Sequence, residues 1–210
     1  MTIHLPHCSQ ALYDANCIIY YCFNLTLKGR NGRVNLKYME LTDKIHILTR
    51  YFLDNNIDIY TLNLIMIEIR RKSVAQIVDE YCNTSEAKRK LGVKHINDAA
   101  RYSIQLNIQS KINKLKDKPW FNIEEYDPDN TDIENVKKFY ESLIGTEKMT
   151  EHIKKKGSAV PSFVDMALLC YSNDNSAHII TNDTDITRFK PELKRDMICF
   201  EVLKLSEVSF

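Results

Sequence analysis

Short apolar runs alternate with longer segments of helical spacing, and this alternation limits the folds open to the chain. From Tyr38 to residue 52, for example, apolar residues recur three and four apart, which is typical of an amphipathic helix. Strands separated by helices indicate a parallel sheet with helices on both faces. We therefore expect an α/β fold, a three-layer α/β/α sandwich around a central parallel sheet. The expected strands are residues 10–13, 57–60, 178–181 and 197–202.

The middle of the chain is rich in helical spacing. Residues 85–156 contain no convincing strand, so we expect them to form a helix-rich insertion within a single domain that spans residues 1–210. Residues 25–37 are basic, contain two glycines and are expected to form a loop, and residues 62–81 are expected to form one helix. A chain of this length buries roughly 70% of its unfolded surface, which is enough for a core without disulfides.

Charge and cysteine content indicate an ordinary intracellular protein. The chain has 29 lysines and arginines and 28 acids, a net charge of +1, so the total indicates neither a nucleic-acid nor a membrane partner. Its six cysteines form no C-x-x-C pair, which favours free thiols. The N-terminus lacks a signal-peptide pattern, and no apolar run approaches the roughly 20 residues of a membrane helix. We expect a cytoplasmic protein with no membrane partner.

The octet from His178 to Asp185 ends a short apolar run in two carboxylates, Asp183 and Asp185. In a parallel sheet with right-handed crossovers, the C-terminal ends of strands and the N-terminal ends of helices lie along one edge. Acids that end strands or begin helices should therefore meet there. Three more acids occupy such places: Asp14, Glu68 and Asp165.

Carboxylates packed together repel one another, and burying them without a partner is expensive. A divalent cation removes that cost, and ligands that are all oxygen favour Mg²⁺ or Mn²⁺ over zinc. Such a site holds an oxygen of a phosphodiester and lowers the pKa of a bound water, and a second ion stabilises the leaving oxygen as well. The acids therefore predict a metal-dependent phosphodiesterase, with one or two ions left open.

Each acid also has a purely structural explanation. Asp14 is a candidate N-cap, and Asp165 completes an S-x-x-D capping box with Ser162. Glu68 is spaced to pair with Lys72 on a helix, and the two acids of the octet are typical turn formers. Each explanation is reasonable singly, but together they leave unexplained why all the acids should share one edge.

The segments around the acids resemble the PIN-domain ribonucleases, the family that includes the VapC toxins of toxin–antitoxin pairs. The segments around Asp165 and Asp183, eighteen residues apart, are the most specific. Matched segments cover the first 80 residues and residues 160–202. Four segments carry the resemblance: Tyr-Asp14-Ala-Asn16-Cys-Ile-Ile, Leu-Ile-Met-Ile-Glu68-Ile-Arg, Phe-Val-Asp165-Met-Ala-Leu-Leu and Ile-Ile-Thr181-Asn182-Asp183-Thr-Asp185.

The resemblance implies a PIN-like fold and endonucleolytic cleavage of RNA with Mg²⁺ or Mn²⁺. It leaves open an antitoxin protein and a homodimer as partners. Compact toxins lack so long a middle segment, so a role in RNA processing is also open. The implied catalytic and metal-binding quartet is Asp14, Glu68, Asp165 and Asp183. The implied further residues are Asp185 as a fifth metal ligand, with Asn16, Thr181 and Asn182 in support.

Contact with an RNA substrate requires cations that offset the backbone phosphates. Arg188 is the favoured candidate because it follows Asp185 by three residues. Any one basic cluster is more often a solvated face, so each candidate has a structural alternative. The other candidates are Arg30 and Arg33 in the glycine-containing segment, Lys190, and the run Lys154–Lys156.

Three other functions compete with this interpretation. The segment Asp183-Thr-Asp185-Ile-Thr187 matches the D-x-D-x-T motif of haloacid-dehalogenase phosphatases, but only 23 residues follow Thr187, too few for the lysine and later acids of that chemistry. A noncatalytic RNA-binding or scaffold module would have no physical need for the full acid set. A structure-specific DNA nuclease would share the site and differ in substrate geometry.

Overall fold

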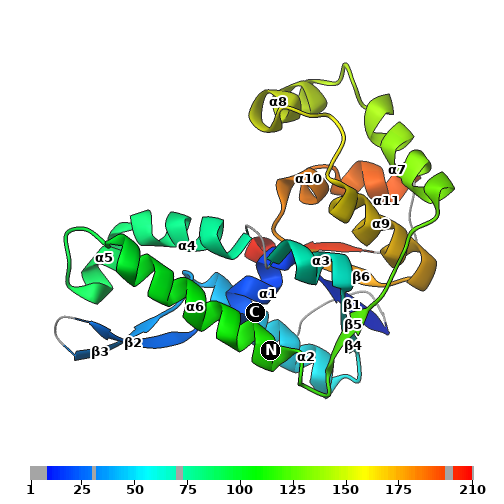
Figure 1. Cartoon of the computed structure of the whole chain (residues 1–210). Coiled ribbons are helices and arrows are strands. Elements are labelled where there is room, and N and C mark those ends of the chain that lie inside the picture. Colours follow the sequence, from blue (N-terminus) through cyan, green and yellow to red (C-terminus); the bar gives the residue numbers. More distant parts are fainter. Residues whose placement is uncertain (1–8, 30–31, 70–72, 197–200, 210) are drawn as a thin grey trace.

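The computed structural model describes residues 9–29, 32–69, 73–196 and 201–209. Its centre is a five-stranded parallel sheet, which confirms the α/β class expected from the sequence (Figure 1). In β1 the residue Leu12 lies in register with Tyr60 of one neighbour and with Ile179 of the other. The order is β5-β4-β1-β6-β7, formed by β1 (Gln10–Tyr13), β4 (Asp58–Leu62), β5 (Phe121–Glu124), β6 (His178–Thr181) and β7 (Val202–Lys204).

The three inner strands are apolar because helices cover the sheet on both sides. Ala11, Leu12, Ile59, Ile179 and Ile180 are completely buried. A strand that faces helices on both sides has no solvent-facing positions, so it needs a continuous apolar run rather than an alternating one. The run at 178–181, expected as a strand from this pattern, forms β6 with the same bounds.

Helices lie on both faces of the sheet, an arrangement compatible with a three-layer sandwich (Figure 1). On one side α1 (Ala15–Cys22) packs against α2 (Leu41–Asp54), and α6 (Asp98–Leu115) packs on α1 from outside. On the other side α9 (Phe163–Asn175) contacts β1 and β6 and is flanked by α7 (Asn130–Ser142) and α11 (Lys190–Asp196). The shorter helices are α3 (Asn63–Glu68), α4 (Val74–Asn83), α5 (Ser85–Leu91), α8 (Glu147–Lys156), α10 (Thr184–Thr187) and the 3₁₀ helix η2 (Leu205–Glu207).

The strand order reverses between β1 and β6. From β1 the chain passes to β4 and then to β5 on one side of β1, and from β6 to β7 on the other. Connections from the two strands therefore diverge, and a crevice opens beyond their carboxyl ends, which is where open α/β sheets bind ligands. Asp14 follows β1 directly, and Asp183 lies two residues beyond β6. The topology thus places both acids at the crevice.

Residues 85–156 contain a strand, so the expectation that this segment has none is wrong. Residues Phe121–Glu124 form β5, which pairs in parallel with β4 and places Phe121 beside Ile59. Four residues are too few to show a clear alternation of apolar and polar side chains in the sequence. The segment is recognisable as a strand only because it pairs with β4. The segment also contributes α7, which packs on α9 in the layer that covers the sheet.

Residues 25–29 and 32–36 form an antiparallel pair of strands, so the loop expected at 25–37 is also wrong. Strand β2 (Leu25–Gly29) pairs antiparallel with β3 (Gly32–Leu36). The apolar residues alternate with polar ones in both strands, a signal of a half-buried strand that the glycines and basic residues obscured. The hairpin contacts α5 and α6 at an end of the molecule away from the five-stranded sheet (Figure 1).

Residues 62–81, which were expected to form one helix, and residues 85–118 each contain two of the described helices. The stretch 62–81 contains α3 and α4, and residues 70–72 between them lie outside the described part. The stretch 85–118 contains α5 and α6, because Gly92 adopts a left-handed conformation that ends α5. Most of the strand expected at 197–202 lies outside the described residues, and β7 begins at Val202.

Four cysteines lie in the described residues, and all four are free thiols in buried positions. This agrees with the expectation of free thiols for those four: Cys17, Cys22, Cys82 and Cys170. Within the described ranges, no helix combines the length and the apolar character needed to cross a membrane.

Candidate active site

Asp14 lies at the junction of β1 and α1, where it caps the helix. Its Oδ1 accepts a hydrogen bond from the backbone N–H of Ala15 at 2.5 Å. Its Oδ2 accepts from Asn16 Nδ2 at 2.6 Å and from Thr181 Oγ1 at 2.5 Å. The carboxylate is 4% exposed, so these neutral donors supply much of its solvation. The capping role is therefore real, and it is combined with burial beside β6.

Thr181 and Asn182 join the ends of β1 and β6, as their expected supporting role requires. Besides its bond to Asp14, Thr181 Oγ1 accepts from the backbone N–H of Asp183 at 2.9 Å. The N–H of Asn182 donates to Asn16 Oδ1 at 3.0 Å, and its own Oδ1 accepts from the N–H of Ser206. These bonds fix the two strand ends relative to each other.

Asp183 and Asp185 lie at the start of α10. Asp183 caps that helix by accepting from the N–H of Asp185 at 2.9 Å, and its carbonyl oxygen accepts from Thr187 Oγ1 at 2.7 Å. These local bonds account structurally for the D-x-D-x-T spacing. The short helix turns both carboxylates back over the crevice, where they line the same pocket as Asp14.

Asp165 occupies the first turn of α9, where it forms the capping box expected with Ser162. Its Oδ2 accepts from the N–H and the hydroxyl of Ser162, at 3.1 and 2.7 Å, while Ser162 Oγ accepts from the N–H of Asp165. Because Oδ2 accepts both bonds, Oδ1 is the oxygen available to a ligand. Asp165 is 8% exposed.

All five predicted acids line one pocket with a volume of 540 Å³ at the carboxyl edge of the sheet. Glu68 reaches it from the end of α3, and the expected partner Lys72 lies outside the described residues. Sequence reasoning missed one acid of the lining, Glu80 on α4, because no strand end or helix start marks it. Asn16 and Asn182 also line this pocket, which we call the acid pocket.

Burial and mutual repulsion raise the pKa values of three of these carboxyl groups. Burial raises the pKa of Asp14 to about 7, helped by the charges of Asp183 and Glu68 and opposed by the bond from Thr181. Burial, with the charge of Asp14 next in importance, raises the pKa of Asp165 to about 8. The pKa of Glu68 is raised by burial and by Asp183. The acids are close enough to oppose one another's ionisation, as in sites that bind cations.

One lysine enters the acid pocket. Lys156, the last residue of α8, has its Nζ 2.7 Å from Asp185 Oδ1 and 3.3 Å from Asp183 Oδ1. Burial lowers the pKa of this ammonium, but the interactions with Asp185 and Asp183 outweigh it and the pKa is raised overall. The lysine was expected as a possible phosphate contact; the structure places it instead against two of the acids.

The segment before α9 also holds Asp185 in place. Tyr140 of α7 donates its hydroxyl to the carbonyl oxygen of Asp185 at 3.0 Å, and His152 Nε2 of α8 lies 3.9 Å from Asp185 Oδ1. Burial lowers the pKa of His152, which favours the neutral ring. Residues of α7 and α8 therefore contact an acid of the site, although no pattern in the sequence connects them with the acids.

The predicted substrate-binding cations lie elsewhere. Arg188 forms an ion pair with Glu151 at 2.6 Å, and within the described lining neither it nor Lys190 borders the acid pocket. Arg33 lies on the hairpin opposite Lys28, and Arg30 is outside the described residues. Their contact with a substrate stays a prediction.

The donor set of the acid pocket fits a divalent cation. The lining carboxylates are hard oxygen ligands of the kind that Mg²⁺ and Mn²⁺ prefer, and burial raises the pKa values of Asp14 and Asp165. Within the described ranges, however, no three His, Cys, Asp or Glu side chains are gathered closely enough to form a ready coordination group. The acids border a common space without converging on one point.

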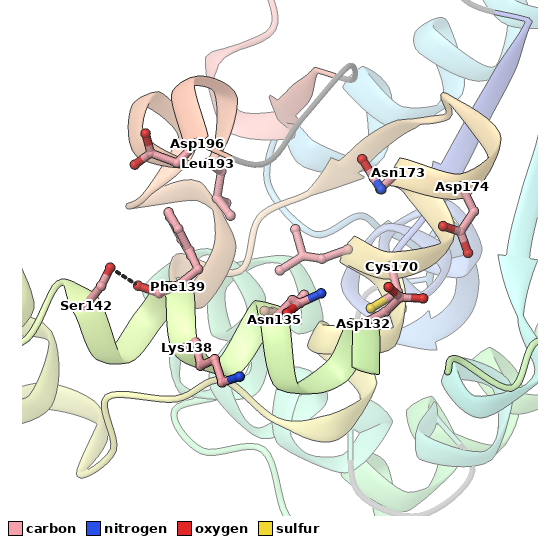
Figure 2. Close-up of a pocket in the computed structure, with 12 residues that line it drawn as sticks. Asp132, Asn135, Lys138, Phe139, Ser142, Cys170, Asn173, Asp174, Leu193 and Asp196 are labelled. Carbon is pink, nitrogen blue, oxygen red and sulfur yellow. Dashed lines mark hydrogen bonds between the residues drawn. The ribbon is translucent and has the colours of Figure 1, made fainter. Parts of the chain in front are cut away.

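A second pocket, of 480 Å³, lies at the other end of α9, between α7 and α11. Figure 2 shows Phe139 and Leu193 on its apolar side and Asp132, Asp174 and Asp196 around it. None of the described residues that line it is a predicted site residue. Two of its acids already have partners, since Asp174 accepts from Tyr126 and Asp196 pairs with Arg195. Fewer acids line it than line the acid pocket.

Comparison with known proteins assigns no relationship: no family model matches the sequence, and no curated protein matches it. The acid pocket therefore has to be interpreted from its own chemistry.

Proposed function

We propose that the protein is a metal-dependent endoribonuclease that hydrolyses RNA phosphodiester bonds at a PIN-like acidic site. One observation carries the proposal: Asp14, Glu68, Asp165, Asp183 and Asp185 come from four separate segments of the chain and line one pocket at the point where the strand order reverses. A set of structural caps has no reason to gather around one pocket. Acids that share a pocket beyond the carboxyl ends of a parallel sheet, three of them with raised pKa values, are typical of catalytic sites.

The acid pocket would hold Mg²⁺ or Mn²⁺ through Asp14, Glu68, Asp165 and Asp183, with Asp185 as a further ligand. When bound, such an ion supplies charge stabilisation of the phosphoryl oxygens and a water of lowered pKa. The chain's own residues prepare the ligands. Asn16 and Thr181 orient the carboxylate of Asp14, and Ser162 orients that of Asp165, so both groups are fixed before a ligand enters.

RNA as the substrate and a PIN-like fold follow from the resemblance of the four acid-containing segments to PIN-domain ribonucleases. The same resemblance leaves two cellular roles, toxin-like cleavage under the control of an antitoxin protein and processing of a structured RNA. The long middle segment, which compact toxins lack, favours processing. Both roles use the same pocket, so the chemistry is testable without choosing between them.

The proposal is tested by measuring Mn²⁺ binding by titration calorimetry and cleavage of single-stranded and structured RNA with Mg²⁺, Mn²⁺ or chelator. The informative variants are Asp14→Asn and Asp165→Asn, each of which keeps the size of the side chain and removes its charge. We expect each to lower Mn²⁺ affinity and cleavage by about 100-fold or more, because loss of even an outer-shell partner of a metal costs about 10- to 100-fold.

The matched control is Asp129→Asn. Asp129 caps α7 as Asp14 caps α1, but it lies outside the acid pocket. Asparagine is as good a cap as aspartate, so this variant should bind Mn²⁺ and cleave RNA as the wild type does. Cleavage of flap DNA but not of RNA would identify a structure-specific DNA nuclease. RNA binding without Mn²⁺ binding would identify a noncatalytic module and contradict the proposal.

A further inference from the structure

The acid pocket is electrostatically divided into two halves. Asp183 and Asp185 on α10 face the ammonium of Lys156, at 3.3 and 2.7 Å. Among the described residues, every hydrogen-bond donor to Asp14 and Asp165 is neutral. Asp14 accepts from the backbone amide of Ala15, the side-chain amide of Asn16 and the hydroxyl of Thr181. Asp165 accepts from the backbone amide and the hydroxyl of Ser162. One half therefore has a lysine of its own, whereas no cation of the described part of the chain pairs with Asp14 or Asp165 in the other.

The position of Lys156 is fixed by the rest of α8 rather than by the acids alone. On the same helix, Lys148 pairs with Glu192 of α11 at 2.7 Å, and Glu151 pairs with Arg188 at 2.6 Å. Met149 and His152 are buried beneath the helix. Residues 148, 152 and 156 recur every fourth residue, so one face of α8 lies against α10 and α11 and delivers Lys156 to the pocket.

A protein ammonium at 2.7 Å from a carboxylate fills the same electrostatic need as a metal ion, because both remove the repulsion between neighbouring acids. A divalent cation on Asp183 and Asp185 would have to displace Lys156 and leave its charge without a partner. At Asp14, Glu68 and Asp165 no such competitor is present among the described residues. The two halves should therefore differ in their affinity for metal.

We propose that Lys156 is the resident cation of the Asp183–Asp185 half, so that the acid pocket takes a single divalent cation, on the side of Asp14, Glu68 and Asp165. This inference rests on the proposed function, because it assumes a pocket that binds Mg²⁺ or Mn²⁺. It narrows the ligand set proposed above, because Lys156 takes the place of a metal ion at Asp183 and Asp185, and α8 thereby supplies the second positive charge of the site from within the chain. Lys156 is thus a positioning residue that holds two acids in place.

The test is the stoichiometry of Mn²⁺ binding by titration calorimetry, for the full chain and for Lys156→Met, which keeps the length of the side chain and removes its charge. We expect one ion per wild-type chain and two per Met variant, the second bound at Asp183 and Asp185. Lys156→Arg restores a cation and should return the count to one. Lys155→Met is the matched control, because Lys155 is the preceding exposed residue of α8, and it should bind one ion.

A second measurement does not depend on the count. Without metal, Lys156→Met leaves two neighbouring acids without their cation and should lower the thermal midpoint, whereas saturating Mn²⁺ should restore it to near the wild-type value. Two ions bound by the wild type, one ion bound by both proteins, or binding by the Met variant alone would overturn the inference. If no form binds Mn²⁺, the proposed function itself fails.

Discussion

Asp14 and Asp165 retain protons at pH values at which an ordinary aspartate is charged, because burial raises their pKa values to about 7 and about 8. In the unfolded chain these groups titrate near 4. Between these limits the folded state binds more protons than the unfolded state. Their contribution to the stability of the metal-free protein is therefore fully present below about pH 4 and is lost as the pH rises through 7 and 8.

The substitution Asp165→Asn removes this dependence at one position. We compare the free energy of unfolding of the variant with that of the wild type in the presence of a chelator. The variant's value minus the wild-type value should rise by roughly 2–4 kcal/mol between pH 5 and pH 8, because the wild type must hold a buried charge at the higher pH. Urea unfolding at both pH values measures the difference. An unchanged difference would show that Asp165 ionises normally in the folded protein.

At the scale of single residues, the sequence predicted the five acids that line the pocket, but not that Lys156 pairs with two of them. Asp14 and Asp183 follow apolar runs of strand length, so their place at the sheet edge follows from chain direction alone. Lys156 could not be found in this way. Its contact with Asp183 and Asp185 depends on where α8 packs, which is set by ion pairs and burial between residues distant in sequence.

At the scale of elements, the first turn of α9 both starts a helix and orients a carboxylate. Replacing Ser162 with alanine removes the hydroxyl that bonds Asp165 and caps the helix. We expect a loss of about 1 kcal/mol of stability from the cap, and Mn²⁺ affinity lower by about 10-fold or more from the freed carboxylate. Chemical unfolding and calorimetry measure the two effects separately.

Thr84→Ala is the control for that change. Thr84 caps α5 through the N–H of Ala87, outside the acid pocket. It should lose similar stability and retain Mn²⁺ affinity. Equal metal affinity in both variants would mean that Ser162 acts only as a helix cap.

Long elements were easier to predict than short ones. The spacing in residues 38–52 predicted α2, whereas β5 has four residues and becomes a strand through its pairing with β4. The hairpin of β2 and β3 carried alternating apolar residues, but charged residues and glycines occupy the positions between them. Tertiary pairing decides the structure of such segments, and no local pattern supplies it.

At the scale of the whole molecule, a net charge near zero conceals a strong separation of charge. Residues 24–37 and 85–118 contain thirteen lysines and arginines and three acids, a net charge of +10, so the remaining residues carry −9. The hairpin contacts α5 and α6, which brings these segments together (Figure 1). Lys28 and Arg33 lie directly opposite each other in the hairpin, an arrangement that costs stability unless an anion lies between them.

We therefore expect this end of the molecule to contact RNA phosphates. The double change Lys28→Gln with Arg33→Gln should weaken RNA binding in chelator and reduce the slope of affinity against salt by about 1–2. Fluorescence anisotropy at several salt concentrations gives both quantities. Lys137→Gln with Lys138→Gln, two lysines of α7 outside both basic segments, is the matched control and should change neither.

The central position of β1 has a consequence for how the protein is made. Asp14 directly follows β1, yet its hydrogen-bond partner Thr181 lies 167 residues later in the chain. Two of the neighbours that bury Asp14, β6 and α9, leave the ribosome only after β4 and β5. Pairing over such a distance comes late in folding. A growing chain therefore contains Asp14 before the pocket exists, and any hydrolytic activity would begin only after β6 has been made.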